Sequence, residues 1–464
     1  MSDPMRAGPI RSEAAASEYL AGLINVEKER NASYSRFDLE PIQRLMERLG
    51  NPQTGLSVLH LAGSKGKGST GLMAEALLGA AGERVGTFTS PHLERWSERF
   101  RIDGREVAGE LLADAVSRIA PHIDEQREED PLHAPSFFDA LTATALLLFS
   151  EAKVDRCVFE VGLGGRLDST NVITAAVSCV TSIELEHTQQ LGNTLAEIAS
   201  EKAGILKPGV PAVMGDLHAE AAEVVEARAR ELGVPLARLG RDFDFEILDR
   251  DLEGQSIRLT DGPLRVDARI AALGSHQARN AALALACVAR APGCVRGGSL
   301  IDAAERGFAA ARLPGRIELI GRAPWLLIDS AHTESSAAAL AEVLHHIPRR
   351  RSQLVLSISA GKDADGILQH LLPEADAVTV TRAEPVRSLS PSEVAAAIRA
   401  AAPDVLVQVV PNPHLAIRAA REDLGAEDLL CVSGSIYLAG IARRVLSDAG
   451  SNERVVVSRR SGVD

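Results

Sequence analysis

Short apolar runs alternate with longer amphipathic segments along the chain, and this alternation restricts the fold more than any other feature. Runs in the first two thirds include "SVLHLAG", "RVGTFTS", "RCVFEVG", "AAVSCVTSI" and "VPAVMG". They are short and rich in β-branched residues, as buried strands are. Helical patterns lie between them, over 69–82, where Gly82 supplies a stop signal, and over 140–152. The alternation predicts an α/β fold in which helices cover both faces of a parallel sheet.

A second series of the same kind begins after residue 313. Its expected strands are 325–331, 353–359, 377–381, 405–410 and 429–435. Its expected helices are 334–347 and 390–402. A chain of 464 residues is too long for one ordinary core. The Pro314–Gly315 pair between the two series is a plausible hinge. We therefore predict a larger N-terminal domain, 1–312, and a smaller C-terminal domain, 313–464.

Composition excludes several classes of function. The formal net charge of −13 argues against nonspecific nucleic-acid binding, which depends on Lys and Arg neutralising phosphates. The sequence contains no apolar run of about 18 residues, so we expect no membrane span. The first twenty residues lack the apolar core of a signal peptide, and the five cysteines have no CxxC spacing. These features are typical of a cytoplasmic protein with reduced thiols.

A glycine-rich, basic stretch, "HLAGSKGKGST" at 60–70, connects an expected strand to a helix expected to start at Ser69. This is the arrangement of a phosphate-binding loop, in which backbone N–H groups and a helix N-terminus face an anion. Lys67 would reach the phosphates of a nucleotide, and Ser69 or Thr70 would face Mg²⁺. The spacing is shorter than in the standard P-loop motif, and a flexible basic turn is the alternative interpretation.

Polar side chains follow three other expected strands. Glu160 ends an apolar run, where a carboxylate is costly unless it is paired or bound to a cation. Mg²⁺ suits such an oxygen ligand, and an ion pair with Arg166 is the alternative. Ser90 and His187 follow two further strands. Because ligands of open α/β sheets bind at the carboxyl ends of strands, we predict that four strand ends form one phosphate and metal site.

Other candidate residues come from helices and from the second series. Lys202 lies fifteen residues after His187, in a helical segment. An amide, a guanidinium and a carboxylate, from Asn280, Arg316 and Asp329, could hold a nucleotide or an amino acid around a cleft between the domains.

Taken together, these segments resemble the folylpolyglutamate synthase and dihydrofolate synthase family, relatives of the Mur peptide ligases. The resemblance runs over nearly the whole chain and includes "HLAGSKGKGST", "TSPHL", "EVGLGGRLDSTNV", "HQARNAALA", "LPGR", "DSAH" and "VSGSIYLAG". It implies an ATP-binding P-loop domain followed by a smaller Rossmann-like domain. It also implies a reaction in which ATP activates a pterin-linked carboxylate as an acyl phosphate and glutamate is then added.

The resemblance also implies roles for particular residues. Binding of ATP would fall to Gly66, Lys67, Gly68, Ser69, Asn280, Arg316 and Asp329. Ser90 and Glu160 would bind one Mg²⁺, His187 would bind Mg²⁺ at a second position, and Lys202 would carry a carbamate. Lys67, His187 and Lys202 are thus the expected catalytic residues. The pterin would lie against two segments, Ser136, Phe137, Phe138 and Asp139, and Leu167, Asp168 and Ser169. His332 and Ser433 would meet the incoming glutamate.

Three positions depart from the commonest bacterial pattern of this family: Lys65, Glu186 and Thr333. They leave the ligase chemistry intact but leave the choice among folate substrates open. A reduced folate that already carries glutamate is the expected acceptor, with dihydropteroate as a second candidate. The alternatives are a Mur-type ligase acting on a cell-wall precursor and a non-catalytic nucleotide-binding switch. We expect a monomer without nucleic-acid or membrane partners.

Overall fold

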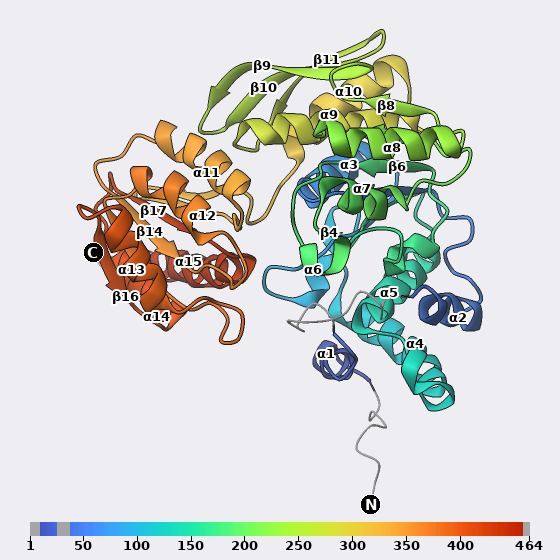
Figure 1. Cartoon of the computed structure of the whole chain (residues 1–464), viewed down its shortest axis with the longest axis horizontal. Helices are drawn as coiled ribbons and strands as arrows, with labels where there is room; N and C mark the ends of the chain where they lie inside the picture. The colour runs from blue at the N-terminus through green and yellow to red at the C-terminus, as the bar shows by residue number, and fades with distance from the viewer. Residues whose placement is uncertain (1–9, 26–37, 458–464) are drawn as a thin grey trace, which may run out of the picture. The chain divides into compact units, whose positions relative to one another are not determined.

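A computed structural model describes residues 10–25 and 38–457, with side chains up to residue 447, and the chain divides into two compact units (Figure 1). The first comprises Met1–Arg250, Gly254–Ala271 and Gln277–Arg312, and the second Asp251–Glu253, Ala272–His276 and Leu313–Asp464. Residues 1–9, on which the expectation of a missing signal peptide partly depends, lie outside the described part. Among the described residues, no helix has the length and apolar character that crossing a membrane requires.

The first unit is built on an eight-stranded sheet of order β4-β3-β2-β5-β1-β6-β7-β8. The strands are β1 (Val58–Ala62), β2 (Val85–Phe88), β3 (Phe100–Ile102), β4 (Arg105–Glu106), β5 (Arg156–Glu160), β6 (Val177–Val180), β7 (Ala212–Met214) and β8 (Leu236–Arg238). All pair in parallel except β3 and β4, so the sheet is mixed rather than purely parallel as expected. A two-residue turn connects these two strands, and both Asp103 and Gly104 have the positive φ that a tight hairpin needs.

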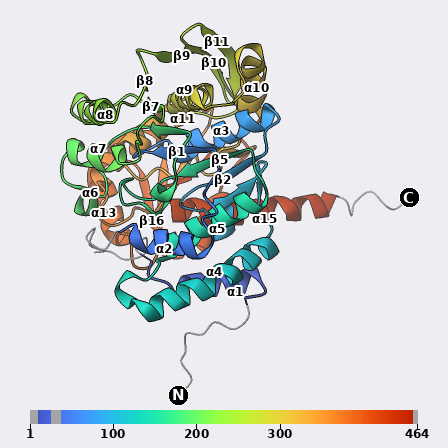
Figure 2. The same ribbon diagram turned by 90° about the vertical axis from the view of Figure 1, so that its right-hand side faces the viewer.

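Helices cover both faces of this sheet, with α3 on one side and α5 on the other (Figure 2). The helices of the first unit are α1 (Glu13–Ala21), α2 (Glu40–Arg48), α3 (Lys67–Ala80), α4 (Gly109–Glu129), α5 (Phe137–Glu151), α6 (Thr188–Leu191), α7 (Leu195–Ala203), α8 (Ala219–Glu231), α9 (Ser275–Arg290) and α10 (Gly297–Ala310), with short 3₁₀ turns η2 (Trp96–Arg99), η3 (Pro131–His133) and η4 (Ser169–Val172).

Helix α3 begins at Lys67 and not at Ser69, where the sequence predicted its start. The residue before it, Gly66, has φ of 85° and serves as the N-cap, so the chain enters the helix two residues earlier. The expected stop is confirmed: Gly82 has φ of 86°, directly after the C-cap Ala81. The first turn of α3 therefore contains Lys67 itself.

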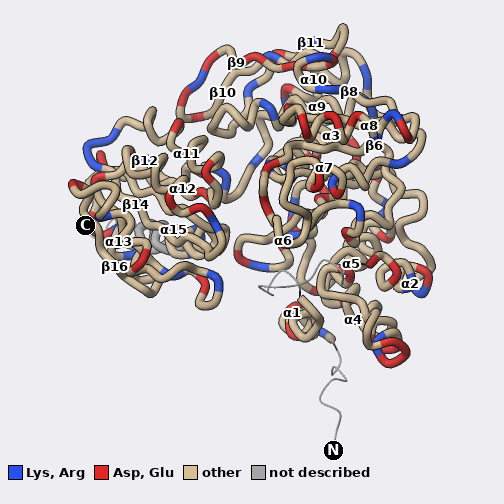
Figure 3. The backbone as a smooth tube through the Cα atoms, viewed as in Figure 1, with Lys and Arg blue, Asp and Glu red and all other residues tan. Residues whose placement is uncertain are grey.

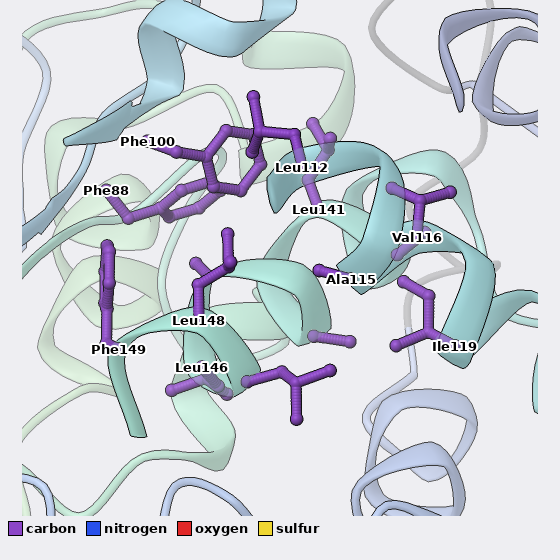
Figure 4. Packing of buried hydrophobic residues seen from close by; sticks show 14 of the residues in the cluster. Phe88, Phe100, Leu112, Ala115, Val116, Ile119, Leu141, Leu146, Leu148 and Phe149 are labelled. Atoms are coloured by element: carbon purple, nitrogen blue, oxygen red, sulfur yellow. The ribbon is translucent and has the colours of Figure 1, made fainter. Parts of the chain in front are cut away.

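Aromatic side chains pack around β2 and β5, two of the strands whose ends carry predicted site residues. Phenylalanines gather in one core cluster with α4 and α5, where Phe88, Phe100 and Phe149 lie close together (Figure 4). The ring centroids of Phe88 and Phe159 are 5.5 Å apart, and those of Phe149 and Phe159 are 5.7 Å apart. Burial of such large apolar rings contributes strongly to stability. It fixes β2 and β5 against α5. All five cysteines are buried and form no disulfide.

A three-stranded antiparallel sheet was absent from our sequence interpretation. It comprises β9 (Phe243–Asp251), β10 (Gly254–Asp261) and β11 (Leu264–Ile270). Charged residues of both signs lie along these strands (Figure 3). Arg258 pairs with Glu246 at 3.3 Å and with Asp267 at 2.8 Å, across all three strands. Along β11, apolar residues from Leu264 to Ile270 alternate with charged ones, which is the pattern of a half-buried strand, so the sequence did contain a signal for this sheet.

The second unit, drawn in orange and red in Figure 1, contains a six-stranded sheet of order β12-β13-β17-β14-β15-β16. Its strands are β12 (Glu318–Arg322), β13 (Trp325–Ile328), β14 (Ser352–Leu356), β15 (Ala377–Val380), β16 (Leu406–Val409) and β17 (Leu429–Ser433). Its helices are α11 (Glu334–His346), α12 (Ala364–Leu371), η5 (Leu372–Glu374), α13 (Pro391–Ala401), α14 (Pro413–Glu422) and α15 (Ile436–Val457). All expected strands are present, and β12 adds an antiparallel edge.

The close contact between α10 and α3 gives a stability prediction. A Cβ at Gly307 would lie 2.6 Å from the Leu77 Cα and 2.7 Å from the Ala76 carbonyl oxygen, both backbone atoms of α3. We expect Gly307→Ala to reduce the free energy of unfolding by about 1–3 kcal/mol, because α10 must move away from α3.

The matched control is Gly298→Ala in the same helix, where nothing lies within 4 Å of the added Cβ. It should stabilise the protein by about 0.5–1 kcal/mol through helix propensity. Urea unfolding of both variants measures the difference. Equal stabilities would contradict close packing of the two helices.

Candidate active site

Four neighbouring strands carry the predicted phosphate and metal residues. In the order β2-β5-β1-β6, Ser90 follows β2, Glu160 ends β5, the glycine-rich loop follows β1 and His187 follows β6. The strands are parallel and in register, with Leu61 of β1 beside both Glu160 and Cys179. His187 has φ of 49°, a left-handed conformation uncommon for a residue with a Cβ. The four strand ends therefore lie side by side at one edge of the sheet.

The glycine-rich loop is held by the chain that follows β6. The backbone N–H of Lys65 donates to Ser182 Oγ at 2.8 Å, and Thr181 Oγ1 donates to the Lys65 carbonyl at 2.6 Å. The N–H of Ser64 donates to the Ser182 carbonyl at 2.8 Å. A Cβ at Gly63 would lie 1.9 Å from Thr181 Oγ1, so this close approach requires glycine. The loop is thus a built element and not the flexible turn of the alternative interpretation.

Lys67 and Asn280 both lie against this loop. Lys67 Nζ donates to the Gly63 carbonyl at 2.7 Å, across the loop. Asn280, from α9, is buried, and a Cβ at Gly66 would lie 2.5 Å from its Oδ1 atom. Thr70 Oγ1 donates to the same Oδ1 atom at 3.5 Å. Among the predicted nucleotide ligands, Asn280 therefore lies beside the loop residues Gly66, Lys67, Gly68 and Ser69.

Glu160 is a buried carboxylate, only 4% exposed, at the end of β5. Its Oε2 atom accepts the backbone N–H of Ser90 at 3.0 Å. Arg166, the alternative partner, pairs with Glu201 at 2.8 Å. Within the described residues, no three His, Cys, Asp or Glu side chains form a complete metal cage. Mg²⁺ usually binds one or two carboxylates together with substrate phosphates and water, and this donor set fits that mode.

Lys202 is buried in α7, and its partner is one the sequence did not reveal. Its Nζ atom lies 3.5 Å from Glu186 Oε1, and Lys65 Nζ lies 3.2 Å from Glu186 Oε2. Burial lowers the pKa of Lys202 to about 8, against the opposing charge of Glu186. Burial alone would raise the pKa of Glu186, but the charges of Lys202, Lys65 and Lys67 outweigh it and hold this pKa well below its usual range.

The two segments expected to meet a pterin contact each other. Ser169 Oγ donates to Asp139 Oδ1 at 2.6 Å, while Ser136 Oγ donates to Asp139 Oδ2 at 2.7 Å. Asp168 Oδ2 accepts the N–H of Leu163 at 2.8 Å, and burial raises the pKa of Asp168 to about 6. These carboxylates therefore fix the backbone of the segments. The partly exposed side chains of the two segments are those of Ser136, Phe138 and Leu167.

The remaining predicted residues belong to the second unit. Asp329 follows β13 and accepts the N–H groups of Ile317 and Ala331, both at 2.7 Å. Burial raises the pKa of Asp329 to about 6. Hydrogen bonds to backbone carbonyls hold two others, Arg316 to Pro314 and His332 to Ser330. Ser433 ends the neighbouring strand β17 and is fully buried, and its hydroxyl has no partner among the described residues.

Comparison with known proteins identifies the family. Residues 61–288 match the Mur ligase middle domain, and residues 315–436 match the Mur ligase glutamate ligase domain. The chain is 37% identical over 417 residues to the dihydrofolate synthase/folylpolyglutamate synthase of Mycobacterium tuberculosis, covering 85% of each chain. It is 31% identical over 438 residues to the Bacillus subtilis protein of the same name, covering 89% of this chain and 96% of that one.

Solved structures agree with this assignment. The chain superposes on the Mycobacterium tuberculosis folylpolyglutamate synthase complexed with ADP and AMPPCP with a TM-score of 0.82 at 36% identity, covering 88% of this chain and 95% of that one. For Escherichia coli FolC with DHPP and ADP the TM-score is 0.81 at 29% identity, covering 96% and 100%. The α/β architecture described above is therefore the Mur-ligase fold, and the chain belongs to the folylpolyglutamate synthase/dihydrofolate synthase family.

Proposed function

We propose that this protein is an ATP-dependent ligase, a tetrahydrofolate:L-glutamate γ-ligase that forms ADP and also accepts dihydropteroate. The observation that carries the proposal is the meeting of a lysine-bearing phosphate loop, a buried carboxylate and an imidazole at four adjacent strand ends. The names of the relatives, which include both folylpolyglutamate synthase and dihydrofolate synthase, support it. So do the related structures with ADP, AMPPCP and DHPP.

The reaction needs positioned charges more than a protein nucleophile. A carboxylate oxygen of the acceptor attacks the γ-phosphorus of ATP, the bond to the bridging oxygen breaks, and ADP leaves. The amine of glutamate then attacks the carbonyl carbon of the acyl phosphate, loses a proton and expels phosphate, which leaves an amide. Lys67 and the backbone N–H groups at the start of α3 would neutralise charge on the transferring phosphoryl group.

The residues at the strand ends fit a divalent cation. Ser90 and Glu160 would hold one Mg²⁺, and His187 would hold Mg²⁺ at a second position. Mg²⁺ neutralises the phosphate oxygens when it is bound. The chain's own contribution is orientation, because the Ser90 N–H donates to the Oε2 atom of Glu160 and helps to hold this carboxylate at the end of β5.

We also propose that Lys202 carries a carbamate. With a pKa of about 8, about a tenth of its amine is neutral at pH 7, far more than for an ordinary lysine. The neutral amine would attack CO₂, form a C–N bond and lose a proton, giving an anion with two oxygens. We expect a carbamate resonance in ¹³C NMR under ¹³CO₂ that Lys202→Ala removes and that the exposed-lysine control Lys153→Ala retains. A bare Lys202 amine in a structure with metal and ATP would contradict it.

The substrate is tested directly. The protein is supplied with ATP, Mg²⁺ and glutamate, with tetrahydrofolate in one sample and dihydropteroate in another, and the products are weighed by mass spectrometry. We expect one added glutamate in both samples, and phosphate release only when glutamate and a folate are present. Addition to dihydropteroate alone would reverse our ranking of the acceptors. Activity only on a cell-wall precursor, or nucleotide binding without turnover, would support one of the alternatives instead.

The domain roles and the assembly are part of the same proposal. We propose that residues 1–312 act as the ATP-binding domain and 313–464 as the glutamate-ligase domain, and the two matched family domains support this division. We also propose a cytoplasmic location, supported by the five buried cysteines without disulfides, and a monomeric state. Light scattering of the purified protein checks the monomer.

A further inference from the structure

One buried carboxylate joins the phosphate loop to α7. Glu186 lies between β6 and α6, and its side chain is only 7% exposed. Each of its oxygens faces a different lysine: Oε2 lies 3.2 Å from Lys65 Nζ, and Oε1 lies 3.5 Å from Lys202 Nζ. The function proposed above uses Lys67 and Lys202 but gives no role to Lys65 or Glu186.

The two lysines differ in their freedom to leave Glu186. Lys202 is enclosed, with 3% of its side chain exposed, whereas 24% of the Lys65 side chain is exposed. The Lys65 backbone is pinned by Ser182 and Thr181, so only its flexible stem can move. Before Lys202 is carbamylated, its ammonium group remains as the counter-ion of Glu186 when Lys65 leaves, so the buried carboxylate keeps a partner.

The neighbouring lysine shows the same arrangement. Lys67 stands two residues from Lys65 in the same loop, and its Nζ atom donates to the Gly63 carbonyl. The ammonium groups of Lys65 and Lys67 therefore both contact oxygen acceptors of the protein, Glu186 and the Gly63 carbonyl. A nucleotide phosphate carries more negative charge than either acceptor and would compete for both.

We propose that Lys65 is a second phosphate-binding cation of this loop. Glu186 is then a positioning residue, which pairs with Lys65 while no nucleotide is bound and keeps Lys202 in place. Binding of a nucleoside diphosphate or triphosphate to the protein with unmodified Lys202 transfers Lys65 from Glu186 to the phosphates, while the pair between Glu186 and the Lys202 ammonium group remains. Nucleotide binding is thereby coupled to α7. This inference rests on the proposed nucleotide site and adds a residue to it.

A double-mutant cycle on the full chain tests the proposal, with the affinity for ADP measured by titration calorimetry. We expect Lys65→Met to weaken binding by about fivefold, a typical coupling for groups in contact. Glu186→Gln should tighten binding by a similar factor, because Lys65 no longer has to leave a carboxylate. In the Lys65→Met background, Glu186→Gln should have little effect. Additive changes, with equal tightening in both backgrounds, would overturn the proposal.

Two controls keep the test decisive. Glu201→Gln removes a carboxylate next to Lys202 in α7 that pairs with Arg166, and it should leave the affinity for ADP unchanged. Glu186→Gln leaves a buried ammonium with less compensation, so thermal unfolding must accompany each titration. If that variant fails to fold, Lys65→Met still decides, because unchanged ADP affinity in it overturns the proposal. A wild-type protein that does not bind ADP would instead overturn the proposed function itself.

Discussion

Replacing Lys67 with alanine will leave the protein folded and reduce its ligase turnover by a factor of at least about 100, the cost of losing one preorganised donor to a transition state. The substitution removes one hydrogen bond, from Nζ to the Gly63 carbonyl, which is worth only about 1 kcal/mol of stability. The same ammonium would neutralise charge on the transferring phosphoryl group, where its loss has no substitute. Thermal unfolding and initial rates of glutamate addition measure the two effects.

A matched lysine separates the local effect from a general change of charge. Lys153 is exposed in the turn after α5, at the start of β5, which is the opposite end of that strand from Glu160. Lys153→Ala should keep both the melting temperature and the turnover of the wild type. Near-normal turnover in a well-folded Lys67→Ala protein would contradict the assignment of the phosphate loop.

The site could be anticipated where short apolar strands end in chemically distinctive residues. Glu160 and Ser90 follow runs whose burial is evident from composition, and parallel strands bring their carboxyl ends to one edge. The loop at Gly66 was recognisable because glycine spacing is a local signal. The start of α3 was misplaced by two residues, because Gly66 takes a left-handed conformation and serves as the N-cap, and the loop has several glycines that could do so.

Other features depend on pairs that no local pattern encodes. The partner of Lys65 is 121 residues away, so the ion pair with Glu186 appears only once the sheet brings the two loops together. The same holds for the hydrogen bond between Ser169 and Asp139, which links the two segments predicted to meet a pterin. The strands β9–β11 were missed for a different reason: the prediction followed continuous apolar runs and passed over the alternation of apolar and charged residues, as in Leu264–Ile270, that marks a half-buried strand.

Glu160→Gln will raise the Mg²⁺ concentration needed for half-maximal turnover by at least about tenfold, the lower end of the loss seen when the surroundings of a metal ligand are altered. Glutamine has the shape of glutamate, and its amide oxygen can still accept the Ser90 N–H, so the loop after β2 should keep its conformation. What disappears is the negative charge that a hard cation prefers. The measurement is turnover against Mg²⁺ concentration at saturating ATP.

A carboxylate at the other end of the same strand provides the control. Glu83 pairs with Arg156, the first residue of β5, at 2.5 Å, so Glu83→Gln removes an equivalent charge far from the strand end that carries Glu160. It should leave the Mg²⁺ dependence unchanged while reducing stability slightly. If both variants keep the wild-type Mg²⁺ dependence, Glu160 is a structural carboxylate that only orients Ser90. If Glu160→Gln alone shifts it, the buried position of this charge is explained by the cation it meets during the reaction.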